Sequence, residues 1–419
     1  MHNHKNGSFT NSLGFVLACV GSAVGLGNIW MFPYRLGEYG GAAFLIPYIF
    51  FICLFGFVGL SAEFAIGRKA GTGTLGSYEL CWKEKKKEKV GKVLGWIPLL
   101  GSLGIAIGYS VIIGWVLRFL CGSVTNTVLE QDSAEYFADV TAFMGNVPWH
   151  VLVIAITVIV LLIGAATQIE KANKILMPLF FVLFSILAVR VFFLPGAKEG
   201  YEFLFVPKWE ALANIDTWVM AMGQAFFSLS ITGSGMIVYG SYLSKKEDIP
   251  RASMQTAFFD TIAAMLSALA IMPAVFAFGI EPSAGPSLMF VTIPNIFKQM
   301  PMGRLFAVIF FLSVCFAGIT SLINMFEAVI ESWQHKFKLK RNHAVLLCGA
   351  LTLIVGLFME EEARVGTWMD FITIIVVPFG AVLGAISIYY ILGFDKIKEE
   401  LKEGRKKGLS KIFKPTAKY

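Results

Sequence analysis

Charged residues are scarce in this sequence. Only 15% of its 419 residues are Asp, Glu, Lys or Arg, whereas soluble domains usually contain about a quarter. Hydrophobic residues make up 56% of the chain, and the mean hydropathy is +0.70. A water-soluble fold of this size could not cover its surface with so few charges. The composition therefore excludes a soluble protein and predicts a polytopic membrane protein, in agreement with the 41 Gly that allow close helix packing.

Cysteine and histidine are also rare. The six cysteines are scattered, mostly in apolar runs, and form no CxxC pair, which excludes a disulfide framework and a cysteine metal site. The five histidines lie at loops or at the ends of apolar runs, whereas a membrane enzyme would need a nucleophile and a base together inside the membrane. The cysteines are Cys19, Cys53, Cys81, Cys121, Cys315 and Cys348, and the histidines are His2, His4, His150, His335 and His343.

Long apolar runs define the predicted architecture. A membrane span needs roughly 20 apolar residues. Ten stretches meet this need, so we expect an all-α membrane protein in one transporter domain, with a basic tail at 394–419 and no cleaved signal peptide. The spans are predicted at 13–36, 42–67, 92–123, 150–167, 172–194, 214–242, 251–280, 303–334, 343–360 and 367–393.

The positive charges gather in alternate loops. The loop 68–92 alone contains eight Lys and Arg residues, and the tail adds nine more, whereas the loop around Glu130 and Asp139 is acidic. By the positive-inside rule the basic side is cytoplasmic, and ten spans then place both termini there, in the plasma (inner) membrane. The run KEKKKEK could instead bind lipid or nucleic acid, but a solvated cytoplasmic loop is the favoured interpretation. The net charge of +7 does not otherwise indicate nucleic acid, because the basic residues lie in short loops between apolar spans.

Two predicted spans contain Gly and small polar residues at mid-membrane depth. These are GSAVGLGN at 21–28 and SLSITGSG at 228–235. Gly disfavours a helix interior, and backbone released from a helix must find partners where no water is available. Each run lies in the first span of a block of five, which predicts a 5+5 inverted repeat (13–194 and 214–393) with its binding site at discontinuous helices. The alternative is that these glycines only serve close helix packing.

The motifs around these runs resemble those of a known family. GSAVGLGNIW, YGGAAFLIPY, EFAIGR, GQAFFSLS and FAGITS occur in this order along the chain. The sequence is similar to the neurotransmitter:sodium symporter family, specifically its bacterial, leucine-transporter-like amino-acid carriers. The resemblance implies two sodium sites built from neutral and anionic oxygens, a donor set that suits a small hard cation. The first would use Ala23, Asn28, Ser228 and Asp260, and the second Gly21, Val24, Ala317, Thr320 and Ser321.

The resemblance also implies a substrate site. The substrate carboxylate would meet the amides around Leu26 and Gly27, the Tyr109 hydroxyl and the first sodium ion, unless Tyr109 is only an interfacial residue. Monoamine carriers of the family have Asp at the position of Gly25, so we expect a substrate with its own carboxylate. Gly233 replaces a Phe of a well-studied relative, which favours a large hydrophobic or aromatic neutral L-amino acid unless a neighbour refills the space. The side-chain pocket would be lined by Ile105, Ile112, Phe227, Ser230, Gly233 and Met325.

Several positions depart from the family pattern. Ala264 replaces the Glu that makes a bacterial relative independent of chloride, so we expect Asp260 to supply that charge, and no chloride requirement. A purely structural Asp260 is the alternative. In the outer gate the family Arg is replaced by Met31, and Arg35 would pair with Asp370 instead. At the cytoplasmic gate the family Arg is replaced by Asn6, and its Asp partner falls near His335.

These features together predict sodium-driven symport by alternating access. A monomer would suffice for transport, and the oligomeric state stays open. A proton-coupled carrier, with Asp260 as the titrating group, and an amino-acid sensor on the same fold are the nearest alternatives. A channel is disfavoured, because it would need a continuously polar pore.

Overall fold

The computed structural model describes residues 12–164, 166–279, 288–405 and 408–418, and every regular element in these ranges is a helix. Three predictions concern residues outside these ranges. They are the gate position Asn6, the N-terminus without a cleaved signal peptide, and the end of the seventh predicted span at residue 280. The first half contains α1 (Ser12–Ala23), η1 (Gly27–Met31), α2 (Phe32–Glu38), α3 (Ala42–Leu54), η2 (Phe55–Leu60), α4 (Ser61–Ala70), α5 (Thr74–Lys83), α6 (Glu88–Leu94), α7 (Trp96–Thr125), α8 (Thr127–Glu130), α9 (Ser133–Val140), α10 (Val147–Ile163) and α11 (Ala166–Phe192).

The second half repeats the pattern of long apolar helices joined by short ones. It contains α12 (Ala197–Phe205), η3 (Trp209–Ala213), α13 (Ile215–Ser228), α14 (Gly235–Ser241), α15 (Ile249–Ala277), η4 (Leu288–Thr292), α16 (Ile293–Gln299), α17 (Gly303–Phe337), α18 (Arg341–Leu357), α19 (Glu362–Asp370), η5 (Phe371–Val376), α20 (Val377–Ala385), η6 (Ile386–Gly393), α21 (Phe394–Lys402) and α22 (Phe413–Lys418).

Six of these helical segments are long and apolar enough to cross a membrane, and a seventh is formed by α1 with η1 and α2, which are bent by 56° at their break. The helices α10 and α18 are apolar but shorter, with 17 residues each. With the split pair α13 and α14, they account for the remaining predicted stretches. The chain is therefore a multi-pass helical membrane protein, while the count of ten spans stays a prediction.

The boundary between the fourth and fifth predicted spans was wrong. We expected the fourth span to reach residue 167 and the fifth to begin at 172, but α10 ends at Ile163 and α11 begins at Ala166. Lys171 and Lys174 indicated a loop in the sequence. In the structure both lie in α11, and the Lys174 ammonium is 2.6 Å from the carboxylate of Glu170, one helical turn away. Such i,i+4 pairs are compatible with a helix.

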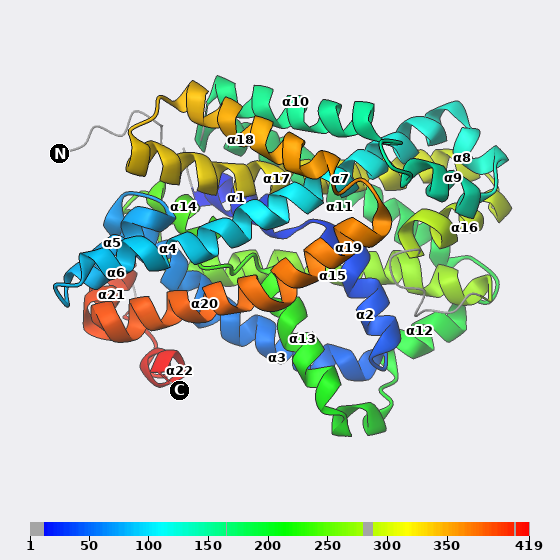
Figure 1. The fold of residues 1–419 in the computed structure, drawn as a ribbon. Helices are drawn as coiled ribbons and strands as arrows, with labels where there is room; N and C mark the ends of the chain where they lie inside the picture. The colour runs from blue at the N-terminus through cyan, green and yellow to red at the C-terminus, as the bar shows by residue number, and fades with distance from the viewer. Residues whose placement is uncertain (1–11, 165, 280–287, 406–407, 419) are drawn as a thin grey trace.

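The predicted basic tail is partly helical. Helix continues from η6 into the charged segment α21, where Arg68 forms an ion pair with Glu400. This contact fastens α21 to the end of α4. Figure 1 shows α5, α6, α21 and α22 at one end of the bundle and α8, α9, α12 and α16 at the other. The basic loops thus gather at one end and the acidic loop at the opposite end.

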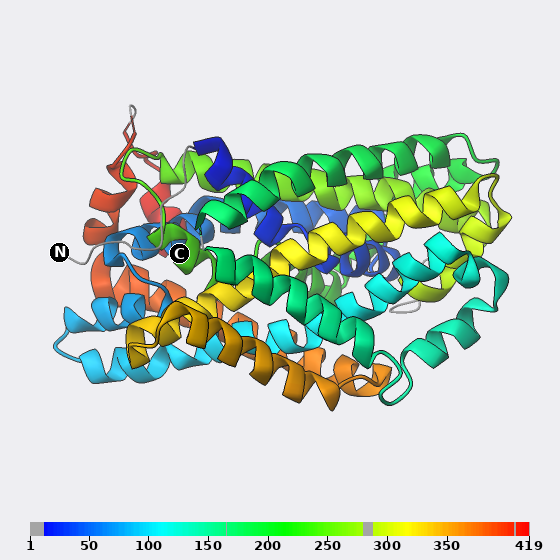
Figure 2. The same ribbon diagram turned by 90° about the horizontal axis from the view of Figure 1, so that it is seen from above.

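The core lies around α7 and α17. The most apolar part of α7 is almost entirely buried, and α7 packs along α17, α10 and α18. The helix α1 packs against α11 and α15, and α14 packs against α4. The view from above shows the long helices running side by side (Figure 2). This packing brings the breaks of α1 and α13 together inside the bundle.

Candidate functional site

The first break lies between Ala23, where α1 ends, and Gly27, where η1 begins. A Cβ atom at Gly25 would lie 2.2 Å from the Tyr109 hydroxyl and 2.7 Å from the Ser321 hydroxyl. Gly25 therefore lets the unwound backbone approach two side chains that any other residue would displace. The Tyr109 hydroxyl accepts a hydrogen bond from the amide of Leu26 at 2.7 Å. The prediction of an interrupted first helix is confirmed.

The second break lies between Ser228, where α13 ends, and Gly235, where α14 begins. Ser230 and Gly233 both have a positive φ, 53° and 73°, so the chain leaves the helical conformation here. The freed amide of Gly233 donates to the buried Glu63 carboxylate at 2.8 Å, and the Ser234 hydroxyl lies 2.8 Å from that of Thr74. These partners satisfy backbone and hydroxyl groups that have no access to water, as buried polar groups require.

Asn28, Ser228 and Asp260 form the first oxygen cluster, and all three are fully buried. The Ser228 hydroxyl donates to the Asp260 carboxylate at 2.7 Å. The Asn28 amide nitrogen lies 3.1 Å from the Ser228 hydroxyl, 2.8 Å from the Asp260 carboxylate and 3.1 Å from the Asp260 carbonyl. The Ser228 hydroxyl and two oxygens of Asp260 thus surround the Asn28 amide nitrogen, while the Asn28 Oδ1 atom accepts from the Gly25 amide at 3.1 Å. With the Asn28 amide turned so that its oxygen joins this cluster, the donor set would fit a sodium ion, and Ala23 lines the pocket nearby.

A second oxygen cluster joins α17 to the unwound part of α1. The Ser321 hydroxyl lies 3.4 Å from the Gly21 carbonyl and 3.1 Å from the Val24 carbonyl. The adjacent Thr320 hydroxyl donates to the Ala317 carbonyl at 2.9 Å within α17. Ser321 therefore contacts Gly21 and Val24 directly, and Thr320 and Ala317 lie on the same turn of α17. Their hydroxyls and carbonyls are neutral hard donors that fit sodium, and the described residues hold no group of three His, Cys, Asp or Glu side chains suited to another metal.

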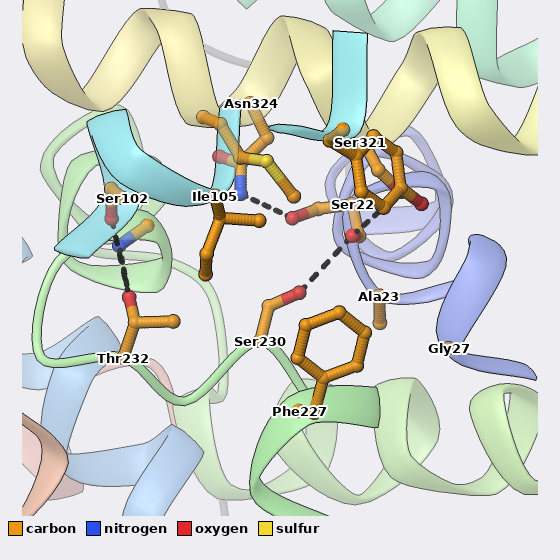
Figure 3. Close-up of a pocket in the computed structure, with 13 residues that line it drawn as sticks. Ser22, Ala23, Gly27, Ser102, Ile105, Phe227, Ser230, Thr232, Ser321 and Asn324 are labelled. Atoms are coloured by element: carbon orange, nitrogen blue, oxygen red, sulfur yellow. Dashed lines mark hydrogen bonds between the residues drawn. The ribbon is translucent and has the colours of Figure 1, made fainter. Parts of the chain in front are cut away.

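A cavity lies between the two breaks, with about 450 Å³ of empty space that includes space open to solvent (Figure 3). The predicted pocket residues Ile105, Phe227, Ser230 and Met325 line it, and so do Tyr109, Ala23 and Gly27. Ser230 also donates to the Ser22 carbonyl at 3.1 Å, which ties one break to the other. Ser321, predicted for the second sodium site, also lines the cavity. Residues that the sequence argument assigned to no site complete the lining: Ser22, Ser102, Thr232, Gly235 and Asn324.

Two predicted pocket residues lie elsewhere. Ile112 lines a neighbouring cavity of about 690 Å³ together with Trp30 and Asp370. Gly233 does not line the 450 Å³ cavity, because a Cβ there would point at the Gly380 carbonyl, 2.5 Å away. The missing side chain at Gly233 therefore allows close packing against α20. It does not enlarge the cavity, and this step of the pocket argument is corrected.

Comparison with known proteins assigns the family. The model of the sodium:neurotransmitter symporter family matches residues 6–140 and 132–413. The chain belongs to this family. It is 32% identical over 424 residues to an uncharacterized sodium-dependent transporter of Bacillus subtilis, covering 97% of this chain and 93% of that protein. It is 33% identical over 418 residues to one of Methanocaldococcus jannaschii, covering 94% and 84%.

A solved structure of this family has the same fold. The structure of MhsT in complex with L-phenylalanine matches with a TM-score of 0.87 at 32% identity, covering 98% of this chain and 95% of that one. As a member of the sodium:neurotransmitter symporter family, the chain is a sodium symporter of the membrane and not an enzyme. The interrupted helices and the oxygen clusters therefore belong to a transporter fold.

Arg35, predicted as a residue of the outer gate, has an unexpected partner. Arg35 is buried in α2 and donates to the Gln224 side chain at 3.1 Å, and Gln224 in turn donates to the Gly27 carbonyl at 2.8 Å. Asp370 is exposed in the neighbouring cavity, and no ion pair joins it to Arg35 among the described residues. The Arg35–Asp370 pair therefore stays a prediction for a closed conformation.

The C-terminal part of α17 contains two carboxylates that the motif comparison missed. Glu327 accepts from the Tyr242 hydroxyl and forms a two-pronged ion pair with Arg341 at 2.8 and 3.0 Å. One turn later, Glu331 accepts from the Thr72 hydroxyl and the Gly73 amide. The i,i+4 spacing of two Glu residues within an apolar span was the signal that could have found them. They tie α17 to α14 and to the α4–α5 turn.

Proposed function

We propose that this protein is a sodium-coupled symporter that imports a neutral L-amino acid with a large hydrophobic or aromatic side chain. The observation that supports this most directly is the convergence of two interrupted helices on one cavity flanked by two oxygen clusters. Such a site can hold a zwitterion and small cations together. The L-phenylalanine in the MhsT complex, on a chain 32% identical over the same fold, supports a side chain of this class.

The substrate would lie with its carboxylate toward Tyr109 and the amides near Gly27. The Tyr109 hydroxyl already accepts from the Leu26 amide, so its own proton is free to be donated to a carboxylate. Gly25 offers no acidic side chain and has no room for one. A substrate that brings its own carboxylate is therefore favoured over a monoamine.

Two sodium ions would drive uptake, one at each oxygen cluster. Each ion releases roughly 1.4 kcal/mol from a tenfold gradient and about 2.3 kcal/mol from a potential of 100 mV. Together they supply about 7 kcal/mol, which supports accumulation on the order of 10⁵-fold at perfect coupling. One ion would supply about half of this free energy.

Transport would be independent of chloride because Asp260 supplies the negative charge. Its carboxylate lies in the first oxygen cluster, within hydrogen-bond distance of Asn28 and Ser228. An ionised carboxylate at this depth is costly unless it is paired. A sodium ion beside it would be such a partner, and no separate anion would then be needed.

The proposed architecture is ten spans in a 5+5 inverted repeat, with repeats at 13–194 and 214–393 in the plasma (inner) membrane. Both termini would be cytoplasmic, which the basic loops at one end of the bundle support (Figure 1). The monomer contains both oxygen clusters and the cavity, so we propose that one chain suffices for transport.

The test is uptake of labelled neutral amino acids into proteoliposomes with the external ions varied one at a time. We expect saturable accumulation that needs sodium, does not occur with potassium alone and persists when gluconate replaces chloride. Uptake that ignores sodium and follows a pH gradient would instead establish proton coupling. Sodium-dependent binding without uptake would indicate a sensor.

A further inference from the structure

The cavity has a polar end that sodium and the amino-acid backbone do not use. Figure 3 shows Ser102 and Thr232 at one end of the cavity and Ala23 and Gly27 at the other, with Ile105 between them. The Ser102 and Thr232 hydroxyls lie 3.5 Å apart, which is a long and weak contact. The two side chains are only 2% and 7% exposed. The Thr232 hydroxyl accepts from the Gly235 amide at 3.2 Å, so both hydroxyls can still donate to a group placed between them.

Asn324 adds an acceptor without a partner. Its side chain lines the cavity and is 2% exposed, and its amide nitrogen donates to the Ser22 hydroxyl. Its carbonyl oxygen Oδ1 is buried and has no hydrogen-bond partner among the described residues. A buried acceptor without a partner costs roughly 1–3 kcal/mol, so such a group in a binding cavity calls for an explanation. A donor on the substrate would supply one.

The middle of the cavity suits an aromatic ring. Ile105 and Met325 are apolar, and the Phe227 ring lies across the cavity from Ile105 in Figure 3. A thioether and a ring edge are both favourable partners of an aromatic ring. With the carboxylate held near Tyr109 and Gly27, a ring in this middle section would direct its far edge toward the Ser102, Thr232 and Asn324 side chains.

We propose that Asn324, with Ser102 and Thr232, selects an aromatic amino acid that carries a hydrogen-bond donor on its ring, namely tyrosine or tryptophan. This inference rests on the proposed function and names the substrate class of that same site. The phenol hydroxyl of tyrosine can donate to Oδ1 of Asn324 and accept from a neighbouring hydroxyl, and the indole N–H of tryptophan can donate. Phenylalanine and leucine leave Oδ1 unpaired. Sites that pair a substrate hydroxyl or N–H discriminate strongly against analogues that lack it.

The experiment measures sodium-dependent binding of tyrosine, tryptophan, phenylalanine and leucine to the purified full chain by calorimetry. We expect tyrosine and tryptophan to bind at least tenfold more tightly than phenylalanine. In Asn324→Leu the ratio of tyrosine to phenylalanine affinity should fall close to one, because tyrosine binds more weakly while phenylalanine binds equally well or more tightly. Ser102→Ala removes one hydroxyl and leaves Asn324 in place, and it should lower the ratio of tyrosine to phenylalanine affinity about threefold. This variant provides a second measurement if Asn324→Leu does not fold.

A matched control comes from Asn146. Its side-chain nitrogen and oxygen are also buried and have no partner among the described residues, but it precedes α10 and does not line the cavity. Asn146→Leu should leave the ratio of tyrosine to phenylalanine affinity unchanged. Phenylalanine binding as tightly as tyrosine and tryptophan in the unmodified chain, or a ratio unaltered by Asn324→Leu, would overturn the inference while leaving the proposed symporter intact. Absence of sodium-dependent binding by any neutral amino acid would overturn both.

Discussion

At the scale of single residues, Gly25 shows how one missing Cβ organises the site. The Tyr109 hydroxyl and the Ser321 hydroxyl occupy the space in which a side chain at position 25 would lie. Ser321 belongs to the second oxygen cluster, and Tyr109 accepts from the Leu26 amide beside the cavity. A substitution here would therefore disturb the substrate position and a cation position together.

Gly25→Ala should weaken sodium-dependent amino-acid binding at least tenfold, because the new methyl group displaces the Tyr109 and Ser321 hydroxyls. The comparison is Gly223→Ala, since a Cβ at Gly223 meets nothing within 4 Å. Both replace Gly with Ala near a broken span, but only at Gly25 would the new Cβ meet close atoms. The check is a binding isotherm for each variant. Equal affinities for the two would mean that the close approach at Gly25 has no role.

At the scale of secondary-structure elements, each break is stable because the freed groups find partners on other helices. Glu63 of α4 accepts from the Gly233 amide, and Gln224 of α13 donates to the Gly27 carbonyl. These contacts cross between the two interrupted segments and their neighbours. In lipid an unsatisfied backbone group costs several kcal/mol, so such partners are a condition for an interrupted span.

Glu63→Leu should lower the free energy of unfolding by roughly 1–3 kcal/mol, because the Gly233 amide would be left buried without an acceptor. Glu63→Gln retains an acceptor oxygen of nearly the same position and should keep most of the stability. Thermal unfolding of the two variants in the same detergent measures the difference. If the Leu variant melted at the same temperature as the Gln variant, the hydrogen bond to Gly233 would not support the break.

At the scale of the whole molecule, charge and packing together fix the orientation that we propose. The basic residues around Lys87 lie at the same end of the bundle as α21 and α22, and the acidic residues around Glu130 lie at the opposite end (Figure 1). Positive charges are retained on the cytoplasmic side during insertion. The ion pair of Arg68 with Glu400 holds α21 at the basic end.

A cysteine placed at Glu130 should react with a membrane-impermeant maleimide in intact cells, whereas one placed at Lys87 should react only after the cells are opened. Both positions are exposed in the structure, so access to the reagent decides the result. Cys53 and Cys121 are the native cysteines that are not buried, and both are replaced by alanine in the labelled background. Labelling of the cysteine at position 87 from outside would reverse the proposed topology.

Much of this site could be predicted because it depends on local sequence. The Gly-rich runs marked both breaks, and the motifs identified Asn28, Ser228 and Asp260, which the fold brings within hydrogen-bond distance of one another. The helix boundary near Gly164 could not be predicted, because a charged Glu170–Lys174 turn looks like a loop until its i,i+4 pairing is seen. The local sequence pattern does not specify which side chain a charged residue will pair with.

By itself, the sequence determined that this chain enters a membrane, interrupts two helices and gathers hard oxygen donors, since composition, Gly content and motif order are properties of the chain alone. Only the tertiary structure decided where side chains point across the bundle. It packed Gly233 against Gly380, paired Arg35 with Gln224 and left the side-chain carbonyl of Asn324 buried without a partner among the described residues. These outcomes depend on how helices distant in sequence rotate and pack against one another, which no local pattern encodes.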